Sequence, residues 1–318
     1  MTFLWGRRWR AANLGRSRLL GGQSRLTAGC GQTCPPSNFA PMLLCLTLAG
    51  CGGLTRHGPV DPALAAFISP DSVALAGVRM DQFRTTPLYR RLAAGNRLPR
   101  FDQFPSEDIH DVLLASDGKN VLAIARGDFR AKPPDGLTPT EYRGYTLYVN
   151  NGRDAIVFID KTTALAASSA AVRAAIDQYK GGGHGAQRDL MARAQALPAD
   201  TQIWAVVVGW PGATPDQLRE LGNLGNVDRM LRAVDGANLT VDLRTGVHAA
   251  VIGNCRTEAD ARNLGDSLRG LTALARMGVQ RKRPDLLRVF DAIQVKQEGR
   301  VVQVTLDIAE DLAEKLIR

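Results

Sequence analysis

Cys51 is the residue whose surroundings most clearly indicate a chemical reaction. A short apolar run, Met42–Leu48, leads to the small residues Ala49 and Gly50, and Cys51 follows directly. Small residues before a cleavage site suit a signal peptidase, which holds the chain in an extended form. The run is much shorter than the roughly 20 apolar residues of a membrane-spanning helix. The pattern therefore predicts an export signal that is cut on the amino side of Cys51.

The four residues Leu48-Ala49-Gly50-Cys51 resemble the lipobox of bacterial lipoproteins and match that motif at every position. The resemblance implies that the Cys51 thiol is diacylated, that the chain is cut before it, and that the new amine is usually acylated as well. Several acyl chains would hold the protein in membrane lipid, whereas one chain alone binds only marginally. The alternative is a buried apolar segment that contains a cysteine by chance.

The residues after Cys51 predict a tether and a location. This segment starts with two glycines and continues with Pro59 and Pro62, so a flexible part precedes a stiffer one. The lipoprotein resemblance implies the cell envelope, with the folded part facing the periplasm. Gly52 stands where such proteins carry an Asp when they are retained at the inner membrane, which favours the outer membrane.

The basic residues that normally open a signal lie unusually far upstream. All six Arg of the signal region lie at or before Arg25, and sequence rich in Gly, Ser, Cys and Pro separates them from the apolar run. We therefore expect a later translation start, so that much of 1–35 is not made. Arg7-Arg8 also resembles a twin-arginine signal, although Arg10 occupies a position that is usually apolar.

Charge and cysteine content argue against two other classes of protein. Residues 1–50 hold six of the 40 basic residues and none of the 31 acidic ones, so the rest of the chain is nearly balanced. A nucleic-acid binder gathers basic residues on one face, and the one dense run, Arg281–Arg283, is typical of a solvated loop; no nucleic-acid partner is predicted. After cleavage only Cys51 and Cys255 remain, so no disulfide is expected within the folded part. Cys255 ends an apolar strand and is typical of a small buried side chain.

The other residues that could perform chemistry form no recognisable active-site motif. The four histidines are His57, His110, His184 and His248. They lack metal-ligand spacing, and neither His-Glu-x-x-His nor Gly-x-Ser-x-Gly occurs. Gly181–Gly185 lacks the Lys-Ser/Thr of a phosphate-binding loop and is interpreted as a linker. Asp154, Asp160 and Asp307 flank predicted hairpins, where carboxylates are usually solvated. The sequence predicts no catalytic residue, no metal and no cofactor.

Sequence markers recur at a spacing of 128 residues and indicate an internal duplication. Pro70, Thr86-Pro87 and Gly118 return as Pro198, Thr214-Pro215 and Gly246. The apolar runs 73–78 and 202–208 are each expected to form a buried strand. Thr followed by Pro is typical of a helix start, and the later glycine is typical of a tight hairpin.

Each half is therefore predicted to follow the order β-α-β-β-(α)-β-β-α. Strands joined by tight turns pair antiparallel, and helices between hairpins cover one face of the sheet. The predicted fold class is α+β, close to a ferredoxin-like plan with an extra strand; the two sheets either join edge to edge or form separate lobes. The later predicted elements are strands 111–116, 119–126, 145–150, 154–159, 237–244, 247–255, 293–297 and 300–308, and helices 170–179, 188–197, 257–277 and 309–317.

The predicted domain organisation has five parts. They are a signal peptide with a misassigned N-terminal extension (1–50), the lipidated Cys and tether (51–66), a first half-repeat (67–180), a Gly-rich linker (181–186) and a second half-repeat (187–318). The halves also resemble uncharacterised exported bacterial domains that open with a turn such as Pro198-Ala199-Asp200-Thr201. That resemblance implies no activity.

Two functions remain open on the sequence alone. The first is a non-enzymatic envelope lipoprotein, a binding or scaffolding domain. It would hold a small ligand or an envelope protein where its halves meet, because junctions between lobes are common ligand sites. The second is a periplasmic hydrolase with an unrecognised carboxylate or His site. A junction pocket with converging buried ionisable groups would favour the hydrolase, and solvated carboxylates would favour the binding domain.

Overall fold

The computed structural model describes residues 59–95, 109–129, 136–183, 185–209, 232–279 and 284–317. The predicted signal, the lipidation site Cys51 and the predicted helix start Thr214-Pro215 lie outside these ranges. None of the described helices combines the length and the apolar character needed to cross a membrane.

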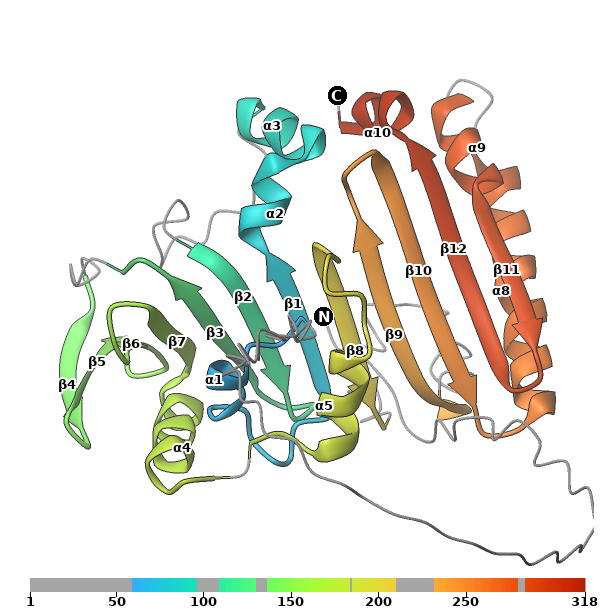
Figure 1. The fold of residues 1–318 in the computed structure, drawn as a ribbon. Coiled ribbons are helices and arrows are strands. Elements are labelled where there is room, and N and C mark those ends of the chain that lie inside the picture. Colours follow the sequence, from blue (N-terminus) through green and yellow to red (C-terminus); the bar gives the residue numbers. More distant parts are fainter. Residues whose placement is uncertain are drawn as a thin grey trace, which may run out of the picture. The chain divides into compact units, whose positions relative to one another are not determined.

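One twelve-stranded antiparallel sheet organises the described residues, in the order β11-β12-β10-β9-β8-β1-β2-β3-β7-β6-β5-β4 (Figure 1). The strands are β1 (Ala74–Arg79), β2 (Ile109–Ser116), β3 (Val121–Gly127), β4 (Thr138–Tyr142), β5 (Tyr145–Asn150), β6 (Asp154–Phe158), β7 (Thr163–Ser168), β8 (Ile203–Val208), β9 (Val234–Asp242), β10 (Gly246–Cys255), β11 (Ile293–Glu298) and β12 (Val301–Ala309). The predicted α+β class with antiparallel strands is confirmed.

The two halves join edge to edge, because β1 pairs directly with β8. Outwards from this pair, each half continues with a hairpin, β2–β3 or β9–β10, and then with a second hairpin, β7–β6 or β12–β11. Between these two hairpins the first half inserts β4 and β5, whereas the second inserts two helices. The sequence analysis placed strands 145–150 and 154–159 as the closing hairpin of the first half. In the sheet, the hairpin at that position is β6–β7.

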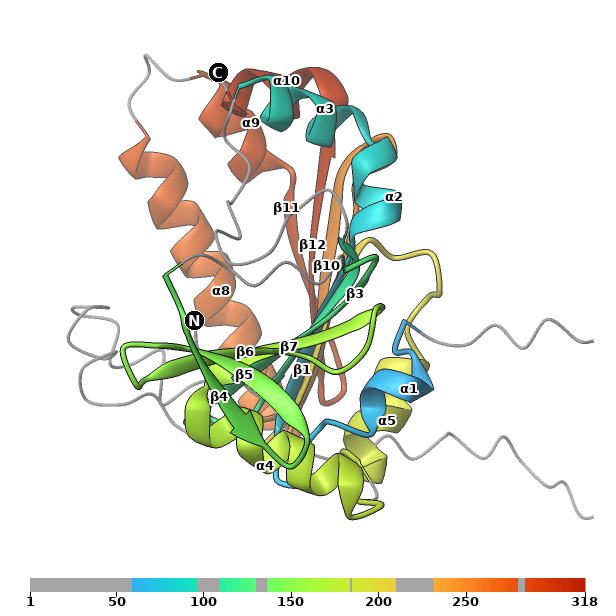
Figure 2. The same cartoon turned by 90° about the vertical axis from the view of Figure 1, so that its left-hand side faces the viewer.

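The described helices pack on both faces of this sheet, so the prediction that they cover one face is wrong. They are α1 (Pro62–Ala65), α2 (Met80–Thr85), α3 (Pro87–Ala94), α4 (Ser169–Lys180), α5 (Arg188–Gln195), α8 (Glu258–Gly278), α9 (Pro284–Asp291) and α10 (Glu310–Ile317). Val206 belongs to the core that α1, α4 and α5 cover, whereas its neighbour Val207 belongs to the core under α8. Since successive strand residues point to opposite faces, α5 and α8 lie on opposite faces, as Figure 2 shows. We refer to the face that carries α1, α4 and α5 as the α5 face.

Local signals place several of these elements where the sequence predicted them. Thr86 caps α3 by accepting the Tyr89 amide at 3.2 Å, and Asn151 and Gly152 both adopt the positive φ angles of a tight hairpin. Cys255 is buried, as expected, and burial raises the pKa of its thiol to about 11. A thiol in this environment stays protonated at neutral pH.

Candidate functional site

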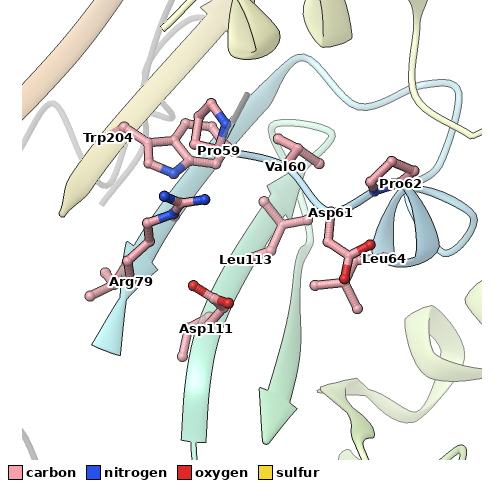
Figure 3. A pocket seen from close by; sticks show the side chains of 12 residues that line it. Pro59, Val60, Asp61, Pro62, Leu64, Arg79, Asp111, Leu113 and Trp204 are labelled. Carbon is pink, nitrogen blue, oxygen red and sulfur yellow. The ribbon is translucent and has the colours of Figure 1, made fainter. Parts of the chain in front are cut away.

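A cavity of about 380 Å³ opens on the α5 face at the junction of the two halves (Figure 3). We call it the junction pocket. Strands β1 and β2 form one part of its wall, the segment that leads into α1 forms another, and Trp204 on β8 comes from the second half. Both halves and the start of the described chain therefore contribute to one cavity.

The wall between the halves depends on a glycine opposite a tryptophan. Gly77 and Trp204 are direct partners across the β1–β8 pair, and a Cβ atom at Gly77 would lie 2.4 Å from the indole. The indole therefore lies flat over Gly77 and is only 1% exposed. No other residue type leaves the backbone of β1 open for this side chain.

The two charged residues of the pocket wall face each other across neighbouring strands. Arg79 on β1 is the register partner of Asp111 on β2. The Arg79 guanidinium donates to the backbone carbonyl of Ala199, in the loop before β8, and Figure 3 shows it turned towards Trp204. Arg79 thus holds the second half against the first and forms no ion pair within 4 Å with Asp111 among the described residues.

Asp111 is left as a half-buried carboxylate without a hydrogen-bond or ion-pair partner in the described part of the chain. Burial raises the pKa of Asp111, and the charge of Asp81 adds to this, while Arg79 and His110 oppose it. A partly desolvated carboxylate is stabilised by a donor or a positive charge. The junction pocket therefore offers an acceptor that no described residue satisfies.

Asp61, the other carboxylate of the pocket wall, is already engaged. It caps α1 by accepting the Ala63 amide at 2.8 Å, and it forms an ion pair with Arg126 at 3.1 Å. A ligand would therefore find Asp111 free to accept a hydrogen bond, with Asp61 as a neutralised neighbour.

A second polar cluster lies on the α5 face of the second half, where strands β9, β10 and β12 carry half-exposed side chains. His248 Nδ1 lies 2.9 Å from Asp307 Oδ1, and His248 Nε2 lies 3.1 Å from Thr245 Oγ1. The order hydroxyl, imidazole, carboxylate is one that hydrolases use. However, the His248 and Asp307 side chains are 42% and 61% exposed, so water screens this array.

Next to it, Asp242 is held by a strong partner. Arg244 donates to both carboxylate oxygens of Asp242 and binds Asp200 at 2.8 Å. The hydrogen bonds from Arg244 lower the pKa of Asp242. Asp242 and Asp111 therefore lie on the same face of one sheet with opposite electrostatic environments.

His110, which precedes Asp111 on β2, is a further ionisable group but does not line the junction pocket. Its Nδ1 lies 3.0 Å from Asp81 and its Nε2 lies 3.4 Å from Asp128. Burial alone would lower the pKa of His110, but the two carboxylates outweigh it and raise the pKa. His110 thus lies at the surface between two acids.

Sequence reasoning did not identify the pocket residues Arg79, Asp111 and Trp204. The predicted site residues Leu48, Ala49, Gly50 and Cys51 lie outside the described ranges. Within those ranges, no group of three or more His, Cys, Asp or Glu side chains is placed to hold a metal. One signal in the sequence could have indicated two of these pocket residues. Arg79 and Asp111 are charged residues at the ends of two apolar strands, and the pairing of β1 with β2 brings these two residues together.

Comparison with known proteins adds little. No protein-family model matches the chain, and no curated protein matches it. Solved structures of TP0453 are similar in fold: crystal form I has a TM-score of 0.46 at 12% identity and covers 81% of this chain and 95% of that one. Crystal form III has a TM-score of 0.44 at 10% identity, with coverage of 81% and 98%. Similarity at this level carries no functional argument.

Proposed function

We propose that the protein is a membrane-anchored lipoprotein of the cell envelope whose folded part binds a small ligand in the junction pocket. The lipobox residues Leu48-Ala49-Gly50-Cys51 support the anchor. The half-buried, partnerless carboxylate of Asp111 supports the binding role and is the observation on which that role depends. The pocket belongs to a domain that faces the periplasm, with the outer membrane favoured.

The chemistry of the pocket defines the class of ligand. Asp111 accepts hydrogen bonds and carries negative charge, so a primary amine or another donor-rich cationic group suits it. Apolar atoms of Val60, Leu113 and Trp204 form much of the remaining wall. A small ligand that joins an ammonium group to an apolar part satisfies both, and burial of the pair raises its affinity.

The binding role is tested by adding small amines, one at a time and at fixed ionic strength, to the full chain and to two variants. The measured quantity is the Tm of each protein. Asp111→Asn removes the free carboxylate, and Asp71→Asn is the control because Asp71 is exposed and lies outside the pocket. We expect one or more amines to raise the Tm of the wild type and of Asp71→Asn, but not that of Asp111→Asn. An equal response of all three proteins would contradict the proposal.

The anchor is tested separately, by labelling cells with a clickable palmitate analogue. We expect the wild-type protein to carry the label and to fractionate with membranes, and the Cys51→Ala variant to do neither. An unlabelled wild-type protein would refute the anchor without affecting the pocket.

The Thr245–His248–Asp307 array supports a second candidate, a periplasmic hydrolase. This candidate ranks below the binding role because His248 and Asp307, although they line a cavity of about 330 Å³, are 42% and 61% exposed. It predicts turnover of an activated ester that His248→Ala abolishes. No turnover above that of His248→Ala would remove it.

A further inference from the structure

Arg193 is a buried cation without a partner among the residues that the structure describes. It lies on α5, which packs over β8 and β1, and it is only 9% exposed. Its Nη1 is sealed from solvent and has no hydrogen-bond partner within the described ranges. Arginine keeps its proton even in such a place, so a full positive charge lies beneath the helix.

The sheet below makes room for this guanidinium. A Cβ atom at Gly236 on β9 would lie 2.8 Å from Arg193 Nη1, so the missing side chain leaves the space that the guanidinium fills. Asn238 is the next residue on the same face of β9, beside Val206 in the core under α5. Its Oδ1 is also buried without a partner. Two unsatisfied polar side chains therefore lie next to each other.

The neighbouring acids do not neutralise Arg193. Asp235 forms an ion pair with Arg256 at 3.3 Å, and Asp189 is exposed one turn earlier on α5. Burial lowers the pKa of Arg193, and the charges of these two acids offset this only in part. A buried charge that lacks a partner costs stability, which a bound anion would restore.

We propose that Arg193 and Asn238 form a binding site for a small oxyanion, a carboxylate or a phosphate group, above Gly236. The guanidinium presents parallel N–H donors in the fork that such anions bind, and the Asn238 amide, turned by 180° about its last bond, adds an Nδ2 donor. The site is separate from the junction pocket, so either proposal can fail without the other.

The test uses the full chain, with inorganic phosphate and acetate as probes and chloride keeping the ionic strength constant. Arg193→Met removes the buried charge at similar length, and Arg188→Met removes an exposed charge from the same helix. We expect a saturable rise in the Tm of the wild type and of Arg188→Met, roughly 5–10 °C at about a hundred times Kd. Arg193→Met should show none. A response to phosphate alone or to acetate alone identifies which anion the site takes.

A rise in Tm that does not saturate, or that Arg193→Met shares, would overturn the proposal. No response to either anion would also overturn it and would leave an ordered water as the partner of Arg193. Gly236→Ala is a second variant, in case Arg193→Met does not fold. Its methyl group displaces the guanidinium and should abolish the saturable response. A full response from Gly236→Ala would also contradict the proposal.

Discussion

Asp111 in the first half and Asp242 in the second are carboxylates on the same face of one sheet, yet their environments are opposite. Arg244 neutralises Asp242 and lowers its pKa. The arginine opposite Asp111 instead binds a backbone carbonyl, and burial raises the Asp111 pKa. Residue type and strand position therefore do not decide the direction of the pKa shift of these two carboxylates. What decides it is the partner of the neighbouring arginine. In the first half that partner is a backbone carbonyl of the second half.

The helices that cover the sheet around the two carboxylates also differ. In the first half, α1, α4 and α5 cover the strands, and the segment that leads into α1 lines the junction pocket. In the second half the inserted helix α8 covers the opposite face, which leaves Asp242, His248 and Asp307 in contact with water.

The largest expected effect concerns the tryptophan that joins the halves. Trp204→Ala should lower the free energy of unfolding by about 3–5 kcal/mol, because it empties a buried site. Ile252→Ala, on the open part of the same face, should cost about 1 kcal/mol or less, since Ile252 is already half-exposed. Urea unfolding of both variants measures the contrast. Equal losses would show that the two halves are covered alike.

Gly77 gives the next largest effect. Gly77→Ala places a methyl group 2.4 Å from the indole and should cost about 1–3 kcal/mol through overpacking. Gly270→Ala is the control, because a Cβ there meets nothing within 4 Å in the middle of α8. That substitution should stabilise the protein by roughly 0.5–1 kcal/mol. Thermal unfolding distinguishes the two, and a stabilised Gly77→Ala would disprove the predicted packing.

The two carboxylates should respond to pH with opposite signs. The folded-state pKa of Asp111 is raised, so its charged form destabilises the fold, and this loss grows as pH rises from the usual 3.8 through the raised value. The pKa of Asp242 is lowered, so its contribution is present above pH 3.8 and is lost as pH falls through the lowered value.

At pH 7, Asp111→Asn should therefore be more stable than the wild type, and Asp242→Asn less stable by up to about 1 kcal/mol. Both differences should shrink towards pH 3. The urea midpoints of the wild type and of both variants, measured from pH 3 to 8, give these differences. Effects of the same sign would break the comparison.

The smallest effect is expected at His110. The pKa of His110 is raised, so its interaction with Asp81 and Asp128 stabilises the fold fully below pH 6.5. This stabilisation is lost as pH rises through the raised pKa. An NMR titration should give a pKa above 6.5, and Asp128→Asn should bring it down. An unchanged pKa in Asp128→Asn would remove the Asp128 contact from the account.

The sequence predicted the positions of the strands better than it predicted which strands pair. Apolar runs, caps and turn glycines placed β1, the β2–β3 hairpin, β8 and α8 within a few residues, because these signals act locally. The strand β7 was missed, since its sequence Thr-Ala-Leu-Ala-Ala-Ser lacks β-branched residues beyond the first. α2 and β4 were not predicted either.

The candidate site could not be predicted, because it depends on contacts that no local pattern encodes. The pairing of β1 with β8 places Trp204 over Gly77, and only this pairing brings Ala199 to Arg79. Arg193 is a similar case. An arginine on a short helix is expected at the surface, and it is buried here because a glycine on β9 leaves space beneath it.

The central claim is that Asp111 is a ligand acceptor, and the carboxyl ¹³C signal of Asp111 tests it most directly. That signal, assigned by its loss in Asp111→Asn, is followed while primary amines are added at constant ionic strength. We predict a saturable shift for at least one amine and a fall in the Asp111 pKa when it is bound, with the Asp242 signal unmoved. An Asp111 signal that no amine moves, or that moves only in step with Asp242, would contradict the account.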